Sequence, residues 1–227
     1  MESDFKEFPK EVGDKDYWAQ VKRTVNGQPV SDSDIALIAN AIRTGLQLQP
    51  GGTDTLLDLG CGNGALTTLF YDSLAACVGV DFSEFLINVA QRDFQQPGKF
   101  EYLVDDASHY LKTCPQPARF NKVLMYGCFA YFPDAQGTLQ LLRQRCTQVE
   151  RVFIGNMPDL KLTDRFYYKG LPPEKELLDF NSKIGIWRTE EQFDELAKTA
   201  GWHAAFPRMP KGFYAAHYRY DVVLTPR

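Results

Sequence analysis

Three small residues and an acid lie close together in residues 56–66. Gly60, Gly62 and Ala65 fit the spacing G-x-G-x-x-[GA]. Glycines there permit a tight turn and let the backbone approach a ligand at a helix N-terminus. Asp81 follows about 20 residues later, where a carboxylate can accept hydrogen bonds from ribose hydroxyls. The spacing therefore indicates a cofactor that contains a nucleoside, and it fits a dinucleotide as well as other cofactors of this kind.

Asp58 distinguishes between these cofactors. It ends an apolar run two residues before Gly60. A carboxylate at this position would repel the pyrophosphate of a dinucleotide, whereas it would attract a cationic amine or sulfonium. The loop therefore predicts a cofactor with a positively charged end, and it argues against a NAD-dependent oxidoreductase.

The elements that position these residues follow from a repeated pattern. Short apolar runs alternate with helical segments, which favours an α/β fold with a parallel sheet and helices on both faces. Strands are expected at residues 53–60, 76–83, 99–107, 120–129, 150–158, 203–210 and 217–227. Residues 14–25 and 63–74 read as helices. Ser31 with Asp34, and Thr189 with Gln192, fit the starts of two more helices as capping boxes.

Composition sets the broad class of protein. The chain has 227 residues, 44% of them hydrophobic, and a net charge of -4. One sizeable core is expected, and no overall positive field attracts nucleic acid or an anionic membrane. The start lacks the apolar segment of a secretory signal, and the five cysteines contain no C-x-x-C pair. We therefore expect a cytoplasmic protein with no metal site, no nucleic-acid partner and no membrane span.

The segments LLDLGCGNG, GVDFS and YLVDDAS together resemble the class I S-adenosylmethionine-dependent methyltransferases. They occur at the ends of the first three expected strands, in the order and spacing of that family. The resemblance implies a doubly wound, Rossmann-like sheet of seven strands, mostly parallel, with the last strand antiparallel. It also implies S-adenosylmethionine as the cofactor and S-adenosylhomocysteine as the product.

The resemblance also assigns roles to individual residues. Asp58 would orient the amino group of the cofactor, Asp81 would hold the ribose hydroxyls, and Asp106 would accept from the adenine amino group. Asp105 is the alternative to Asp106, which is preferred because an Asp-Ala pair follows the strand in the family pattern. The other residues expected at the cofactor are Gly60, Cys61, Gly62, Asn63, Gly64, Phe82, Ala107 and Tyr126.

The acceptor is expected opposite the glycine loop, because ligands of doubly wound sheets bind outside the carboxyl ends of the strands. Tyr131, Asn156 and Tyr214 are predicted to bind it. A hydroxyl acceptor must lose a proton, for which a histidine or a carboxylate is suited. His217 and Asp159 are therefore the candidate catalytic bases. The alternatives are a structural histidine at a strand start and a turn residue after a proline.

The predicted organisation is an N-terminal helical cap at residues 1–50 and a methyltransferase domain at residues 51–227. Residues 159–187 form an insertion too long for an ordinary connection, which indicates a lid or a subdomain. The predicted acceptor is a small molecule, methylated on oxygen or nitrogen, such as a sugar or natural-product intermediate. This predicted activity is similar to that of stand-alone bacterial methyltransferases. The alternatives are an RNA or protein methyltransferase, a NAD-dependent oxidoreductase and a non-catalytic binding module.

Overall fold

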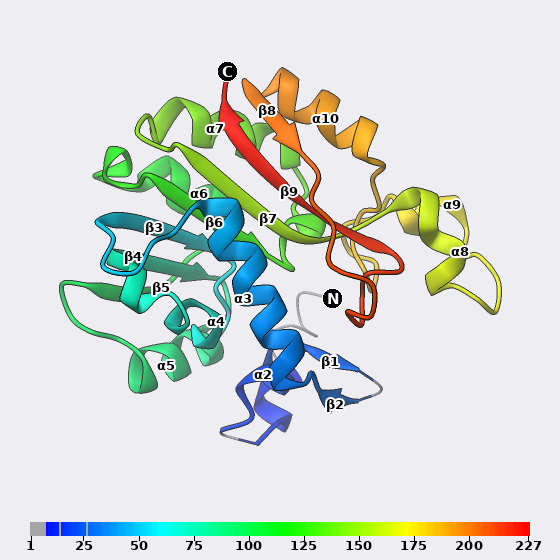
Figure 1. Cartoon of the computed structure of the whole chain (residues 1–227), viewed down its shortest axis with the longest axis horizontal. Helices are drawn as coiled ribbons and strands as arrows, with labels where there is room; N and C mark the ends of the chain where they lie inside the picture. The colour runs from blue at the N-terminus through cyan, green and yellow to red at the C-terminus, as the bar shows by residue number, and fades with distance from the viewer. Residues whose placement is uncertain (1–7, 14, 26) are drawn as a thin grey trace.

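A seven-stranded sheet forms the centre of the molecule (Figure 1). The computed structural model describes residues 8–13, 15–25 and 27–227. The strand order is β5-β4-β3-β6-β7-β9-β8. The strands are β3 (Asp54–Leu59), β4 (Leu74–Asp81), β5 (Phe100–Val104), β6 (Lys122–Tyr126), β7 (Arg151–Pro158), β8 (Trp202–Ala205) and β9 (Arg219–Pro226). Strands β3 to β7 pair in parallel, and β9 is antiparallel to both β7 and β8. The predicted doubly wound α/β fold is confirmed.

Helices cover both faces of this sheet. α3 (Asp32–Leu46) crosses the near face in Figure 1, and Gly45 allows a close approach, because a Cβ there would lie 2.3 Å from the ring of Phe153. α6 (Ala107–Thr113), α7 (Ala135–Arg145) and α10 (Glu190–Thr199) cover the opposite face, and α5 (Glu84–Asp93) packs beside β4 and β5. The shorter helices are α2 (Tyr17–Gln20), α4 (Ala65–Thr68), α8 (Thr163–Phe166) and α9 (Glu174–Leu177). The 3-10 turns are η1 (Phe8–Glu11), η2 (Tyr71–Ser73), η3 (Pro117–Arg119), η4 (Phe129–Tyr131) and η5 (Leu160–Leu162).

The alternation of side chains along the strands places several polar groups on the α3 face. In β3, Leu57 and Leu59 belong to the core under α6, α7 and α10, so Asp58 points to the α3 face. In β9, Tyr220 and Val222 belong to that same core, and Asp221 between them also points to the α3 face. The carboxyl end of the sheet therefore carries buried acids on one face.

Three predicted elements differ from the structure. Within the helix expected at 14–25, residues 17–20 are helical and the other described residues are not. β1 (Thr24–Val25) and β2 (Gln28–Pro29) instead form an antiparallel hairpin, which suits β-branched residues next to a turn. The helix expected at 63–74 is α4 followed by η2. The strand expected at 203–210 ends at Ala205, shortly before Pro207, which has no N–H for pairing.

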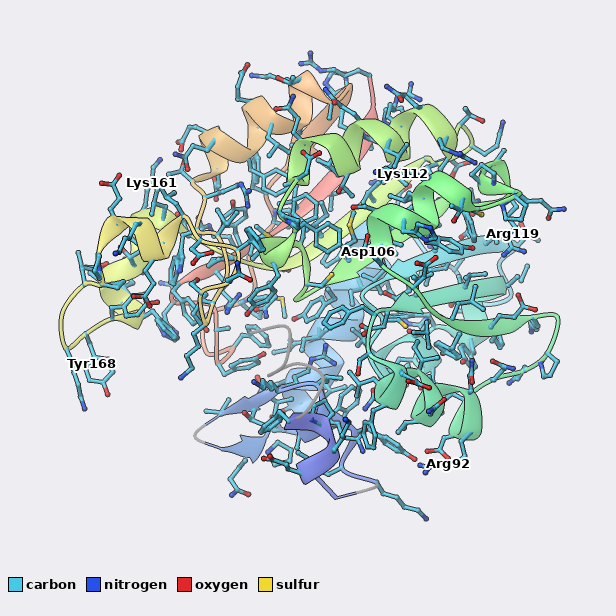
Figure 2. The ribbon with its side chains drawn as sticks, turned by 180° about the vertical axis from the view of Figure 1, so that it is seen from behind. Arg92, Asp106, Lys112, Arg119, Lys161 and Tyr168 are labelled. Carbon is cyan, nitrogen blue, oxygen red and sulfur yellow. The ribbon has the colours of Figure 1, made fainter. Side chains whose placement is uncertain are left out.

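The insertion at residues 159–187 packs against the body of the protein. The ring of Phe166 lies 5.8 Å from that of Trp187 and 4.8 Å from that of Tyr218. The main chain of Ile186 also bonds to the loop after β6, through the carbonyl of Ala130. By contrast, Tyr168 is 79% exposed and lies at the outer tip of the insertion (Figure 2). The inner half of the insertion therefore adds to the core, and its role as a lid stays a prediction.

Candidate active site

The glycine loop between β3 and α4 makes close contacts that need glycine. Gly60 and Gly62 have φ angles of 75° and 58°, which side chains rarely adopt. A Cβ on Gly60 would lie 2.7 Å from the sulfur of Cys128, in the loop after β6, and a Cβ on Gly62 would lie 2.8 Å from Val21. The loop is therefore enclosed by β6's carboxyl end on one side and by the N-terminal segment on the other.

Asp81 ends β4 and holds this loop in place. Its Oδ2 accepts from the main-chain N–H of Gly62 at 2.9 Å, and its Oδ1 accepts from that of Ser83 at 2.9 Å. Burial raises the pKa of the Asp81 carboxyl, and these two hydrogen bonds lower it. A carboxylate offers about four lone-pair sites. Acceptor capacity therefore remains for ribose hydroxyls.

Asp58 is a buried acid with one hydrogen-bond donor. It is 3% exposed, and the hydroxyl of Thr67 donates to its Oδ2 at 2.6 Å. Burial raises the pKa of Asp58 to about 7. Among the described residues, no lysine, arginine or histidine nitrogen lies within the 4.0 Å of an ion pair with it. A buried, unpaired carboxylate is suited to bind a cationic amine, as the cofactor expected from the sequence would supply.

An apolar surface and a free acceptor follow β4 and β5. Phe82 is 40% exposed and Val104 is 50% exposed, and Val104 pairs with Asp81 in the sheet register. Asp106 caps α6, next to Ala107, through its Oδ1 alone, and it lies exposed at the start of that helix (Figure 2). Asp105 is instead bonded to the ring of His109. This arrangement offers a flat apolar surface for an aromatic base and leaves Oδ2 of Asp106 as an acceptor.

The N-terminal segment is tied to the glycine loop by Asn63. The amide of Asn63 donates to the carbonyl of Tyr17 at 2.8 Å and to Oε1 of Gln20 at 2.9 Å. Asn63 itself is only 2% exposed. The helix α2 is therefore held against the loop.

A bulge at the end of β7 places Asn156 beside Tyr126. Ile154 pairs with Val222 and Met157 pairs with Tyr220, so β7 has one residue more than β9 between these pairs. Asn156 is at a φ of 68° and its N–H donates to Oδ1 of Asp221 at 2.8 Å. The side-chain Oδ1 of Asn156 is buried and has no hydrogen-bond partner. An acceptor with a donor group would satisfy it.

A narrow hollow lies in this region, at the carboxyl ends of β6 and β7. It is lined by Tyr126, Asn156, Met209, Phe213, Ala215, Ala216, Arg219, Tyr220 and Asp221. Burial raises the pKa of Asp221 to about 6, while the N–H of Asn156 and the charge of Arg219 lower it. As it stands the hollow is too narrow to hold a water molecule, and its walls combine aromatic rings with polar groups.

The remaining predicted acceptor residues occupy different surroundings. Tyr214 is half-buried in the connection between β8 and β9, and burial raises its pKa. His217, three residues later, is exposed, with its ring 4.7 Å from that of Tyr218. The hydroxyl of Tyr131 donates to the carbonyl of Lys183 in the insertion at 3.0 Å. Their roles at the acceptor, and that of His217 as a base, stay predictions.

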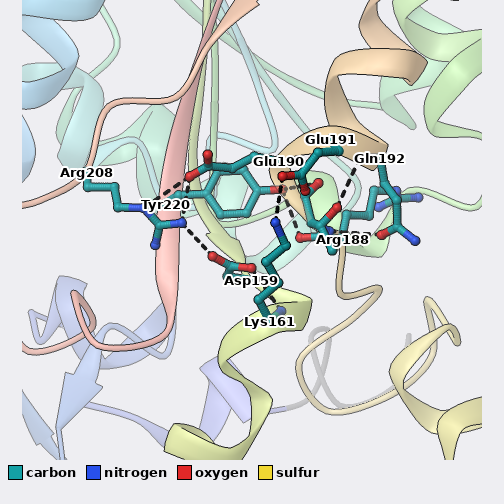
Figure 3. A network of polar contacts seen from close by, with 9 residues as sticks. Asp159, Lys161, Arg188, Glu190, Glu191, Gln192, Arg208 and Tyr220 are labelled. Carbon is teal, nitrogen blue, oxygen red and sulfur yellow. Dashed lines mark hydrogen bonds and ion pairs between the residues drawn. The ribbon is translucent and has the colours of Figure 1, made fainter.

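Asp159 is part of an ion-pair network (Figure 3). It is 1% exposed, and its Oδ2 lies 2.5 Å from a guanidinium nitrogen of Arg208, which also pairs with Glu190. Its Oδ1 accepts from the N–H of Lys161 at 3.0 Å. These contacts give the carboxylate a structural use, and its catalytic role stays a prediction.

The sequence interpretation missed Arg23, Arg219 and Asp221. An acid inside an apolar run singled out Asp58, and the same signal occurs at Asp221 in YDVVL. Arg23 carries no comparable signal, because the hairpin that brings it to the sheet was read as a helix. The guanidinium of Arg23 lies 5.1 Å from the ring centre of Tyr126.

The described part of the chain has neither a cluster of metal ligands nor a disulfide. No group of three or more His, Cys, Asp or Glu residues is placed there to hold a metal ion. All five cysteines are free thiols. None of the helices described is both long and apolar enough to cross a membrane.

Comparison with known proteins agrees with the motifs and the fold. Residues 56–148 match a family described as a methyltransferase domain. No curated protein matches the chain. Magnesium protoporphyrin IX methyltransferase from Synechocystis, solved with bound S-adenosylhomocysteine, superposes with a TM-score of 0.65 at 14% identity, covering 99% of this chain and 97% of that one.

Two further solved structures show the same fold. The 1,6-didemethyltoxoflavin-N1-methyltransferase from Burkholderia thailandensis has a TM-score of 0.58 at 16% identity, covering 87% of this chain and 79% of that one. A putative S-adenosylmethionine-dependent methyltransferase from Listeria monocytogenes has a TM-score of 0.61 at 14% identity, covering 87% of this chain and 100% of that one. The motifs, the family match over residues 56–148 and the strand order all agree with a class I S-adenosylmethionine-dependent methyltransferase. It is an enzyme whose cofactor is S-adenosylmethionine.

Proposed function

We propose that this enzyme methylates an oxygen or a nitrogen of a small molecule, such as a sugar or a natural-product intermediate. The observation that carries the proposal is the enclosed acceptor region. Tyr126 and Asp221 are buried there, and the N-terminal segment and the insertion pack on either side. A small polar molecule suits such a region better than a folded RNA or a protein surface.

The cofactor is proposed to lie across the carboxyl ends of β3, β4 and β5. Asp58 would hold its amino group, Asp81 its ribose hydroxyls and Asp106 its adenine amino group. The second carboxylate oxygens of Asp58 and Asp106 and the remaining lone pairs of Asp81 support this arrangement. When bound, S-adenosylmethionine supplies a methyl group activated by its sulfonium.

The protein's own contribution is positioning and proton removal. Tyr126 and Asn156 would hold the acceptor atom in line with the methyl group, and such orientation can supply several kcal/mol. The acceptor oxygen or nitrogen would take the methyl group, leaving S-adenosylhomocysteine, and would give up its proton to a base. His217 and Asp159 are the bases proposed from the sequence; the exposed His217 has no ion-pair partner in the described chain, unlike Asp159.

The proposal is tested with radiolabelled S-adenosylmethionine and three fractions of a cell extract: metabolites below about 1 kDa, RNA and protein. Label is expected in the metabolite fraction with the wild-type enzyme and not with Asp81→Ala, which loses the proposed ribose ligand. Label appearing mainly in RNA or protein would overturn the small-molecule assignment. His217→Asn then tests the base: unchanged kcat across the pH profile would exclude His217.

A further inference from the structure

Two arginines approach the same pair of tyrosines on the acceptor side of the site. Arg23 comes from the N-terminal segment and lies 5.3 Å from the ring centre of Trp18 and 5.1 Å from that of Tyr126. Arg219 begins β9 and lines the hollow. Burial raises the pKa values of Tyr126 and Tyr214, and the positive charges of both arginines act against this rise. Segments nearly 200 residues apart in the chain therefore place one cation over Tyr126 and another along the hollow that Tyr126 lines.

Neither arginine is in an ion pair within the described residues. Arg208 and Arg43, by contrast, each lie within 3 Å of a carboxylate. Arg219 donates to the carbonyl of Asn156 and its guanidinium lies 4.8 Å from the ring centre of Tyr218. Burial lowers the pKa of Arg23. Two guanidinium groups, desolvated in part and without a carboxylate partner, are costly, unless a ligand supplies the negative charge.

Two acids face these arginines, and both are engaged elsewhere. Asp221 acts on Arg219 but accepts from the N–H of Asn156. Asp58 also acts on Arg23, and it accepts from Thr67. Tyr126 and Tyr214 are neutral phenols near neutral pH, because burial raises their pKa values. Among the described residues neither acid forms an ion pair with Arg23 or Arg219, so direct contact with an oxyanion is left to a ligand.

We propose that Arg23 and Arg219 bind an oxyanion of the acceptor, so that the small molecule methylated here carries a phosphate or a carboxylate. The guanidinium group suits both, because its planar N–H donors match two oxygens at once. The inference rests on the proposed function and narrows its substrate class. The oxyanion would be held between Tyr126 and Tyr214, which leaves the rest of the acceptor free to reach the methyl group.

In the experiment, the enzyme is first saturated with S-adenosylhomocysteine. This complex is then titrated with inorganic phosphate and, in a separate run, with acetate, while sodium chloride keeps the ionic strength constant. Calorimetry is expected to show saturable binding of one of these anions with a Kd of about 10 mM or lower. Arg23→Gln and Arg219→Gln are each expected to weaken it about 10-fold or more, and Arg23→Lys and Arg219→Lys less. Arg92→Gln, on the exposed α5, removes the same charge and is the matched control.

Preference for phosphate would indicate a phosphorylated acceptor, and preference for acetate a carboxylate. No binding of either anion to the wild-type complex would overturn the inference, as would binding that neither arginine variant weakens. The cofactor also has a carboxylate, so each variant is measured with S-adenosylhomocysteine and with methylthioadenosine, which lacks it. A variant that loses affinity for S-adenosylhomocysteine but not for methylthioadenosine would assign that arginine to the carboxylate of the cofactor and overturn the inference. Failure of the wild type to bind S-adenosylhomocysteine would instead contradict the cofactor site itself.

Discussion

The main-chain N–H of Gly62 donates to Oδ2 of Asp81 at 2.9 Å, which joins the loop after β3 to the end of β4. One carboxylate thus has two tasks. It fixes a loop that contains a left-handed glycine, and its remaining lone pairs are available for the proposed contact with the ribose of the cofactor. In the proposed site, loop shape and cofactor recognition would therefore be coupled through Asp81.

This coupling predicts a large effect of Asp81→Ala. The variant loses the acceptor for Gly62, the acceptor for Ser83 and the proposed ribose contact. Affinity for S-adenosylhomocysteine is expected to fall by about 100-fold, because charge-assisted hydrogen bonds contribute about 1.5–3 kcal/mol each. Asp81→Asn, which keeps one oxygen acceptor, is expected to lose less. Isothermal titration calorimetry measures both, and an unchanged affinity of the alanine variant would contradict the ribose role.

The burial of Asp58 predicts that cofactor binding depends on pH. Its pKa is about 7 in the free protein, so its charged form, which attracts the cofactor's ammonium group, is lost as the pH falls below that value. Affinity for S-adenosylhomocysteine is expected to be about 10-fold lower at about pH 6 than at about pH 8. Asp58→Asn should bind more weakly and lose most of this dependence. Equal affinities of the wild type at the two pH values would count against a direct contact.

The sequence predicted what depends on local patterns. Alternating apolar runs and helical segments indicated the sheet, and acids at the ends of successive strands placed Asp58, Asp81 and Asp106 at one edge. Such patterns repeat within a few residues and need no knowledge of distant contacts. This explains why the position of these three acids at one edge of the sheet could be predicted from the sequence.

The acceptor side depends on long-range pairing, which the sequence does not display. The bulge at Asn156 appears only when β7 is aligned with β9. Asp221, which accepts from the N–H of Asn156, lies 65 residues further along the chain. The ion pair of Asp159 depends on Arg208, 49 residues away. Arg23 lies beside Tyr126 just before a hairpin that pairs residues 24–25 with 28–29, where the sequence predicted a helix continuing to residue 25 and a turn after it.

Asp221 predicts a pH-dependent stability. Its pKa is raised from 3.8 to about 6 by burial, so the native state holds a proton that the unfolded state has lost between these values. This group's contribution to the free energy of unfolding therefore decreases as the pH rises through that window. Asp221→Asn keeps an oxygen acceptor for the N–H of Asn156 without a charge. The free energy of unfolding of Asp221→Asn, relative to that of the wild type, is expected to rise by about 2 kcal/mol between about pH 4.5 and about pH 8.

Urea unfolding of the wild type and of Asp221→Asn at the two pH values measures this difference in the free energy of unfolding. The other buried acids are present in both proteins, so their effects cancel in the comparison. A constant difference would show that Asp221 has an ordinary pKa. The same variant also informs on the hollow: Arg219 would then lack its neighbouring carboxylate, so phosphate binding should be maintained or strengthened if the oxyanion site exists.

The acceptor region is most tightly packed at Gly155, so a larger side chain there is expected to be destabilising. A Cβ at this position would lie 2.3 Å from Cδ2 and 2.5 Å from Cε2 of the Tyr126 ring, and 2.9 Å from the ring of Phe153. Gly155→Ala must therefore displace Tyr126 towards Arg23, whose guanidinium lies over the same ring. A loss of about 1–3 kcal/mol in the free energy of unfolding is expected, together with a lower kcat/KM.

A double-mutant cycle separates this clash from a general effect of alanine. In the Tyr126→Ala background the ring is absent, so Gly155→Ala should cost at least about 1 kcal/mol less than in the wild type. The contact with Phe153 is present in both backgrounds and cancels in the comparison. Equal costs in the two backgrounds would show that Tyr126 does not rest on Gly155, and the position assigned to its hydroxyl beside the acceptor would then have to be abandoned.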